Sequence, residues 1–156
     1  VHRRLGDLAL ADLADALATL AGKHPDLDLD RVAIRGRGVG GWLAALAVLR
    51  HPETFRCAVA EAPVVDWANH DPAYAQRHLG PPDDGTEVYQ RHSLLAVAAE
   101  LGGSTGPIRL VPGPDGAAGD LTRLAELLPS AATVALTSSI EDTAGWLLAR
   151  LSRPRG

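Results

Sequence analysis

A run of glycines between two apolar segments is the feature that most constrains how this chain folds. Residues 35–41 read Arg-Gly-Arg-Gly-Val-Gly-Gly, directly after the apolar residues 32–34 and directly before residues 42–50. The first apolar segment predicts a short buried strand, and the second predicts a helix that ends at His51-Pro52. The glycines therefore predict a tight strand-to-helix turn, in which the backbone bends sharply or approaches a neighbour closely.

The segments on either side extend this pattern into a domain. Leucines at helical spacing predict a first helix over residues 7–21, and residues 57–60 predict a second buried strand. Two strands separated by a helix form a βαβ unit, whose strands are parallel. Residues 62–106 are irregular. Two further strands, at 108–111 and 133–136, and two further helices, at 121–128 and 141–151, are predicted beyond them. We expect one α/β domain over residues 1–156 with an irregular insert at about 62–106.

Composition excludes several classes of function. The chain has 156 residues, 46% of them hydrophobic and 22% charged, with a formal net charge of -4, so neither nucleic acid nor an anionic membrane is an expected partner. No apolar stretch is long enough to cross a bilayer. Cys57 is the single cysteine, which rules out an internal disulfide and a cysteine zinc site and suits a cytoplasmic location. We expect no metal and no cofactor.

The glycine turn matches a nucleophile elbow that lacks its nucleophile. In α/β-hydrolases a Gly-x-Ser-x-Gly turn holds the serine between a strand and a helix, and the next backbone N–H donates to the oxyanion. Here the five positions are Gly36, Arg37, Gly38, Val39 and Gly40. Glycine tolerates the strained backbone of the central position, so the turn is compatible with loss of the serine.

The same glycines also match a dinucleotide-binding fingerprint. Gly36, Gly38 and Gly41 fit the G-x-G-x-x-G pattern in the required strand-turn-helix setting. Glu61 lies 20 residues after Gly41, at the end of the next predicted strand, where a ribose-binding acid belongs. A third interpretation is that the glycines only permit close packing. The turn alone leaves all three open.

Two downstream segments favour the hydrolase. Residues 62–67 read Ala-Pro-Val-Val-Asp-Trp, and residues 74–82 contain Tyr-x-x-Arg-His-Leu-Gly-Pro-Pro. Together with the upstream glycine turn and Gly41-Trp42, they resemble the prolyl oligopeptidase, dipeptidyl peptidase IV and acylaminoacyl peptidase group of serine peptidases, as far as about Gly116. The resemblance implies a partial α/β-hydrolase, a three-layer sandwich with a mainly parallel sheet of about four strands.

The resemblance also identifies the positions at which that group carries its catalytic triad. The nucleophile position is Gly38, and the acid position is Gly116, with Asp115 displaced by one residue. The histidine is expected within residues 137–143, but no histidine follows His92. The Val39 N–H remains as a vestigial oxyanion donor. A chain without nucleophile and base is predicted to be inactive.

Binding residues and partners follow from the same resemblance. His70 lies near a substrate-binding position of the group, and Arg77 matches the arginine of its Tyr-x-x-Arg segment, although an ion pair would also explain Arg77. A sheet that lacks early strands has an exposed edge, which predicts a protein partner or a homo-oligomer that covers it. Three alternatives stay open. The first is an active hydrolase that uses a partner chain or another serine among Ser93, Ser104, Ser130, Ser138 and Ser139. The second is an NAD(P)-binding domain that uses Gly36, Gly38, Gly41 and Glu61, and the third is a decayed gene product. The metal-capable side chains Asp66, His70, Asp71 and His78 match no zinc spacing.

Overall fold

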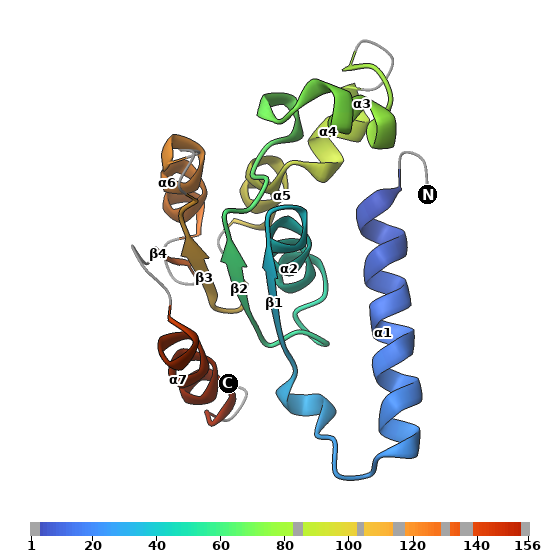
Figure 1. The fold of residues 1–156 in the computed structure, drawn as a ribbon, viewed down its shortest axis with the longest axis vertical. Coiled ribbons are helices and arrows are strands. Elements are labelled where there is room, and N and C mark those ends of the chain that lie inside the picture. Colours follow the sequence, from blue (N-terminus) through green and yellow to red (C-terminus); the bar gives the residue numbers. More distant parts are fainter. Residues whose placement is uncertain are drawn as a thin grey trace.

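The structure, a computed structural model, describes residues 4–82, 86–102, 105–113, 118–128, 132–134 and 139–153. Strands and helices alternate through most of these residues (Figure 1). In chain order the elements are α1 (Leu5–Lys23), the 3-10 turn η1 (Leu29–Arg31), β1 (Ala33–Arg37), α2 (Val39–Arg50), β2 (Cys57–Glu61), η2 (Trp67–Asn69), α3 (Pro72–Leu79), α4 (Thr86–His92), α5 (Leu94–Leu101), β3 (Ile108–Val111), α6 (Ala118–Leu127), β4 (Ala132–Val134) and α7 (Ile140–Leu151).

The four described strands form one parallel sheet in the order β1-β2-β3-β4. One row of the register aligns Gly36 with Ala60, Ala60 with Leu110, and Leu110 with Val134. Parallel neighbours need crossover connections, and a helix lies within each one here. The predicted α/β class and the parallel sheet of about four strands are confirmed.

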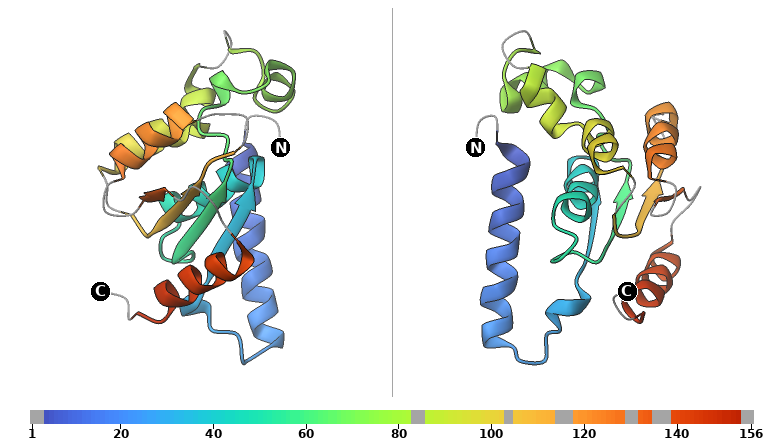
Figure 2. Two further views of the ribbon diagram at one scale, coloured as in Figure 1. Left: turned by 60° about the vertical axis from the view of Figure 1, so that its left-hand side comes forward. Right: turned by 180° about the vertical axis from the view of Figure 1, so that it is seen from behind.

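Helices cover both faces of the sheet. Gly36 faces α2, because a Cβ built on it would lie 2.1 Å from the backbone oxygen of Gly40. Arg109 is in the alternate row and points the other way, where its guanidinium binds the Asp142 carboxylate of α7 at 3.2 Å. Figure 2 shows α7 set apart from α2 and α5, and α1 beyond β1. The arrangement is a three-layer sandwich.

The core lies between the sheet and α2, the most deeply buried helix. Trp42 and Trp67 pack edge to face with ring centroids 5.1 Å apart. The Trp42 indole N–H donates to the backbone oxygen of His92 at 2.7 Å, which ties α2 to the insert. Small residues let α2 approach the strands, and its fully buried side chains include Ala44, Ala45, Leu46, Ala47 and Val48.

Element boundaries differ from the sequence prediction mainly at helix starts. The first helix is longer at both ends than 7–21, and α2 begins at Val39 rather than at residue 42, because Gly38 serves as its N-cap. The insert is more ordered than predicted, with η2, α3, α4 and α5 between β2 and β3. Among the described residues, no helix is long and apolar enough to span a membrane.

Candidate functional site

The turn between β1 and α2 has the backbone of a nucleophile elbow. Gly38 has φ +59° and ψ -122°, in a region that L-residues rarely adopt. Its N–H donates to the Glu61 oxygen at 2.9 Å, and its own oxygen accepts from the Trp42 N–H at 3.0 Å. A Cβ built on Gly38 would have no heavy atom within 4 Å. The turn therefore leaves room for the side chain that it lacks.

Two other glycines are needed for close packing. A Cβ on Gly36 would lie 2.1 Å from the Gly40 oxygen, and a Cβ on Gly41 would lie 2.7 Å from the Glu61 oxygen. Both distances are below any real contact of a Cβ atom. The packing interpretation of the sequence therefore explains Gly36 and Gly41, while the unusual backbone explains Gly38.

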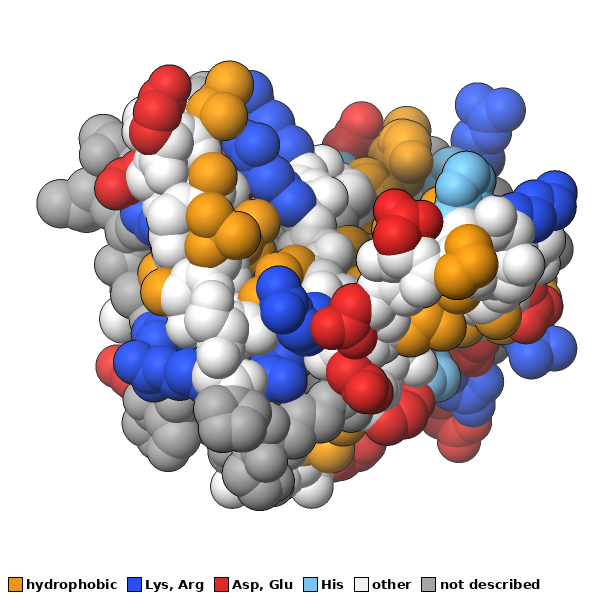
Figure 3. All heavy atoms as spheres, turned by 90° about the horizontal axis from the view of Figure 1, so that it is seen from below, with side chains coloured by type: hydrophobic (Ala, Val, Ile, Leu, Met, Phe, Trp, Pro, Cys, Tyr) orange, Lys and Arg blue, Asp and Glu red, His pale blue; other side chains and the backbone are white. Residues whose placement is uncertain are grey.

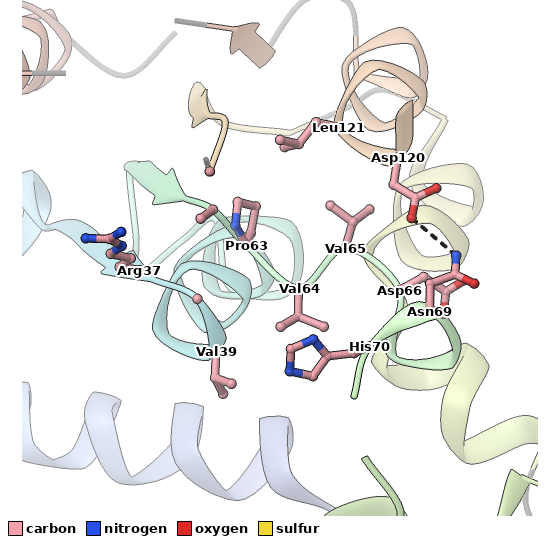
Figure 4. A pocket seen from close by; sticks show the side chains of 13 residues that line it. Arg37, Val39, Pro63, Val64, Val65, Asp66, Asn69, His70, Asp120 and Leu121 are labelled. Atoms are coloured by element: carbon pink, nitrogen blue, oxygen red, sulfur yellow. Dashed lines mark hydrogen bonds between the residues drawn. The ribbon is translucent and has the colours of Figure 1, made fainter. Parts of the chain in front are cut away.

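A pocket of about 470 Å³ opens beside the elbow, at the carboxyl ends of β1, β2 and β3. Ligands of open parallel sheets bind at this end of the strands. Figure 4 shows side chains from the elbow, from the segment after β2 and from α6 around one space. The lining residues are Arg37, Gly38, Val39, Ala62, Pro63, Val64, Val65, Asp66, Asn69, His70, Gly113, Asp120 and Leu121.

Arg37 lies at one end of the pocket, and the two carboxylates with Asn69 lie at the other. In Figure 4 Arg37 is separated from Asp66, Asn69 and Asp120 by apolar side chains. The Asn69 amide donates to the Asp120 carboxylate at 3.2 Å, and the Asp66 carboxylate accepts from the Ala68 N–H at 3.0 Å. The acidic end is therefore held by hydrogen bonds within the protein.

His70, which the sequence predicts to be a binding residue, is among the residues that line the pocket. Its ring is positioned by aromatic neighbours: it meets Trp67 edge to face at 5.6 Å between centroids and Tyr74 at 6.0 Å. Arg77, the second predicted binding residue, is exposed on α3 and is not a lining residue. Of the two predicted binding residues, the structure therefore brings only His70 to the pocket beside the elbow.

The lining contains no serine, threonine or cysteine among the described residues. Ser93 is buried at the start of α5, and the Ser139 hydroxyl accepts from the Asp142 N–H as the cap of α7. His92 is fully buried and stacks on Trp42 at 5.9 Å between centroids. The other predicted positions, Ser104, Asp115, Gly116, Ser130 and Ser138, lie outside the described residues.

Among the described residues, the side chains considered for dinucleotide binding and for metal binding are not arranged as those sites require. The Glu61 carboxylate, the candidate ribose ligand, forms an ion pair with Arg35 at 2.6 Å and does not line the pocket. Within the described ranges, no group of three or more His, Cys, Asp or Glu side chains could hold a metal ion.

A model of the prolyl oligopeptidase family of peptidases matches residues 1–113 of the chain. The chain belongs to this family. Membership favours the hydrolase interpretation of the glycine turn over the dinucleotide one, because the match includes the elbow and the segment after β2. The resemblance drawn from the sequence motifs is thereby confirmed.

The relatives that the chain resembles in sequence include one named as a dipeptidyl peptidase and one named as inactive. Human dipeptidyl peptidase 8 is 34% identical over 98 residues, which is 63% of this chain and 11% of that protein. The mouse protein named inactive dipeptidyl peptidase 10 is 33% identical over 95 residues, 61% of this chain and 12% of that protein. The chain thus matches about one ninth of the length of these relatives.

Solved structures show the same fold. Porphyromonas gingivalis dipeptidyl peptidase 4 superposes with a TM-score of 0.78 at 22% identity, covering 96% of this chain and 24% of that one. A dipeptidyl aminopeptidase IV assigned in Bacteroides ovatus superposes with a TM-score of 0.71 at 24% identity, covering 85% of this chain and 19% of that one. Both support the α/β-hydrolase architecture.

Proposed function

We propose that this chain is a catalytically inactive prolyl oligopeptidase-type domain that has kept a role in binding or assembly. The observation that carries the proposal is Gly38: the elbow keeps its strained backbone and the space for a side chain, yet has no nucleophile. The family's chemistry begins with attack by a serine oxygen, so its absence removes the acyl-enzyme route.

The pocket supports the proposal, because it holds no replacement nucleophile among the described residues. His70 is the one described histidine in the lining, and the other lining side chains are aliphatic, amide, carboxylate and guanidinium groups. A histidine base without a side-chain hydroxyl or thiol to deprotonate cannot form the acyl-enzyme on which the family's route depends. The Val39 N–H at the start of α2 would donate to an oxyanion, but it supplies neither nucleophile nor base.

Hydrolysis assays with dipeptidyl p-nitroanilides test the inactive assignment. We expect product formation at the rate of the buffer blank, with an active dipeptidyl peptidase as the positive control. The matched variant is Gly38→Ser, which introduces the hydroxyl where the structure has open space. We expect the variant to stay far below the active dipeptidyl peptidase, because no described residue of the pocket forms a base paired with an orienting acid, and a serine alone keeps only residual catalysis. Turnover by the unmodified chain that scales with its concentration would refute the proposal.

A further inference from the structure

The junction between α4 and α5 is held from within by a buried histidine. His92 is the last residue of α4 and is fully buried. Its ring stacks on Trp42 of α2 with 5.9 Å between centroids, and its backbone oxygen accepts the Trp42 indole N–H at 2.7 Å. Arg50, also on α2, donates to the backbone oxygen of Arg91. Helix α2 therefore holds the end of α4 through the ring and through two backbone oxygens.

The hydrogen bonds of the His92 ring fix its neutral form. Nδ1 lies 2.7 Å from the backbone oxygen of Val88, which can only accept, so Nδ1 carries the hydrogen. Nε2 is then an acceptor, and within the described part of the chain this buried atom has no hydrogen-bond partner. A proton added to Nε2 would create a buried cation whose new N–H has no acceptor. Protonation therefore favours a conformation in which the ring reaches solvent.

The charges near the ring do not offset this cost. In the described ranges, the charged groups that act on His92 are Asp7 from α1, Arg50 from α2 and Arg91 from α4 itself. The Asp7 carboxylate, which would attract the proton, is already bound by the Arg50 guanidinium at 2.5 Å. Burial is the largest effect on the ring, and it holds the pKa of His92 below the usual value for histidine.

The same junction is joined directly to the wall of the pocket. Leu94, two residues after His92, donates its N–H to the backbone oxygen of Val65 at 2.9 Å, and Val65 lines the pocket in Figure 4. A second connection is a chain of rings in edge-to-face contact that runs from the ring beneath His92 to the lining: Trp42, Trp67 and His70. Movement of His92 out of its site would therefore remove two supports of the pocket wall.

We propose that His92 is a pH-sensitive latch, whose protonation releases the α4–α5 junction and loosens the pocket wall at Val65 and His70. The wall is fixed while the ring is neutral and loses its support when the ring is charged. This regulation rests on the binding role proposed above for its use, whereas the conformational step needs neither ligand nor substrate. Because His92 is fully buried by residues of this chain, the latch does not depend on what covers the outer surface.

Amide exchange of the isotopically labelled full chain tests the latch, with the Leu94 amide as the reporter. With a pKa of about 6.5 for the released ring and a latched ring that stays neutral, the opening equilibrium should rise about eightfold between pH 7 and pH 5.5. Protection at Leu94, corrected for the intrinsic exchange rate, should fall by that factor. His92→Asn should remove this pH dependence. The matched control His51→Asn changes a ring that is 45% exposed beside Glu53, and it should leave the dependence intact.

Urea separates release of the latch from unfolding of the whole domain. Figure 3 shows acidic and basic side chains together on the end of the molecule away from the insert, so lowering the pH acts on the wider surface as well as on His92. The reference for such general effects is the amide of Ala58, a fully buried residue of β2, which donates to the Pro107 oxygen at 3.0 Å. At pH 5.5, adding 1 M urea should accelerate exchange at Ala58 at least about tenfold. Exchange at Leu94 should change less than about twofold, because opening the junction exposes little surface.

Three results would overturn the proposal. The first is protection at Leu94 that does not change between pH 7 and 5.5, and the second is equal acceleration by urea at Leu94 and Ala58. Both are measured on the unmodified chain, so they decide the question without any variant having to fold. The third is a pH response that persists in His92→Asn and is lost in His70→Asn, which would assign the titration to the pocket histidine. None of these results bears on the hydrolysis assays, so the latch and the inactive assignment fail separately.

Discussion

Replacing the three glycines of the elbow one at a time with alanine measures what each contributes to the turn. Gly38→Ala introduces a Cβ into open space, so its cost comes only from the backbone at φ +59°. Such a conformation costs a residue with a side chain about 1–3 kcal/mol. Gly36→Ala would instead place a Cβ 2.1 Å from the Gly40 oxygen, which no side-chain movement relieves.

Gly40→Ala is the matched control within the same turn. It lies in the first turn of α2, has no heavy atom within 4 Å of a built Cβ, and does not have a positive φ. Alanine is favoured over glycine in helices by up to about 1 kcal/mol, so this variant should be neutral or more stable.

Urea unfolding followed by circular dichroism checks the series. With an m value of about 2 kcal/mol/M, a loss of about 2 kcal/mol lowers the midpoint for Gly38→Ala by roughly 1 M. Gly36→Ala should lose about 4 kcal/mol or more, or fail to fold. If Gly38→Ala were as stable as Gly40→Ala, the elbow would not have the strained backbone described above, and the reasoning would be wrong.

Three further predictions concern the core. Burial, together with the positive charge of Arg50, holds the pKa of His92 below the usual histidine value of about 6.5, despite the hydrogen bond to the Val88 oxygen. As the pH falls, the His92 side chain therefore binds a proton in the unfolded chain before it does so in the folded chain, and the free energy of unfolding should decrease below about pH 6.5. His92→Asn should make the urea midpoints between pH 7 and 5.5 less dependent on pH. Burial also raises the pKa of the Cys57 thiol against the opposing effects of Arg56 and Arg150; reaction with a thiol-specific disulfide reagent should be slow in the folded chain and fast in urea. Gly6→Ala places a Cβ 2.7 Å from the Leu46 side chain. It should destabilise the chain by about 1–2 kcal/mol in urea unfolding, and equal or greater stability would show that α1 does not pack there.

Local patterns were enough to predict the sheet and the elbow. Residues 32–34, 57–60 and 108–111 are short apolar runs, and each became part of a parallel strand because each is bounded by turn residues and followed by a helical segment. The glycine spacing predicted the turn, since few other residues tolerate the backbone at Gly38. These inferences depend only on neighbours in the sequence.

The pocket could not be predicted in the same way. Asn69 and Asp120 are 51 residues apart, and their hydrogen bond depends on how η2 and α6 meet over the end of the sheet. Neither residue is part of a motif. His70 was predicted from its place in the segment after β2, but Arg77 follows in the same segment and lies outside the lining, because α3 turns its side chain toward solvent.

Labelling with a fluorophosphonate followed by intact mass spectrometry tests the central claim most directly. The reagent reacts with any activated serine, whatever its position in the chain, so it also tests the serines that lie outside the described residues. We expect no adduct on the purified full chain under conditions that label an active dipeptidyl peptidase completely. A stoichiometric adduct would contradict the claim, and the peptide that carries it would identify the nucleophile.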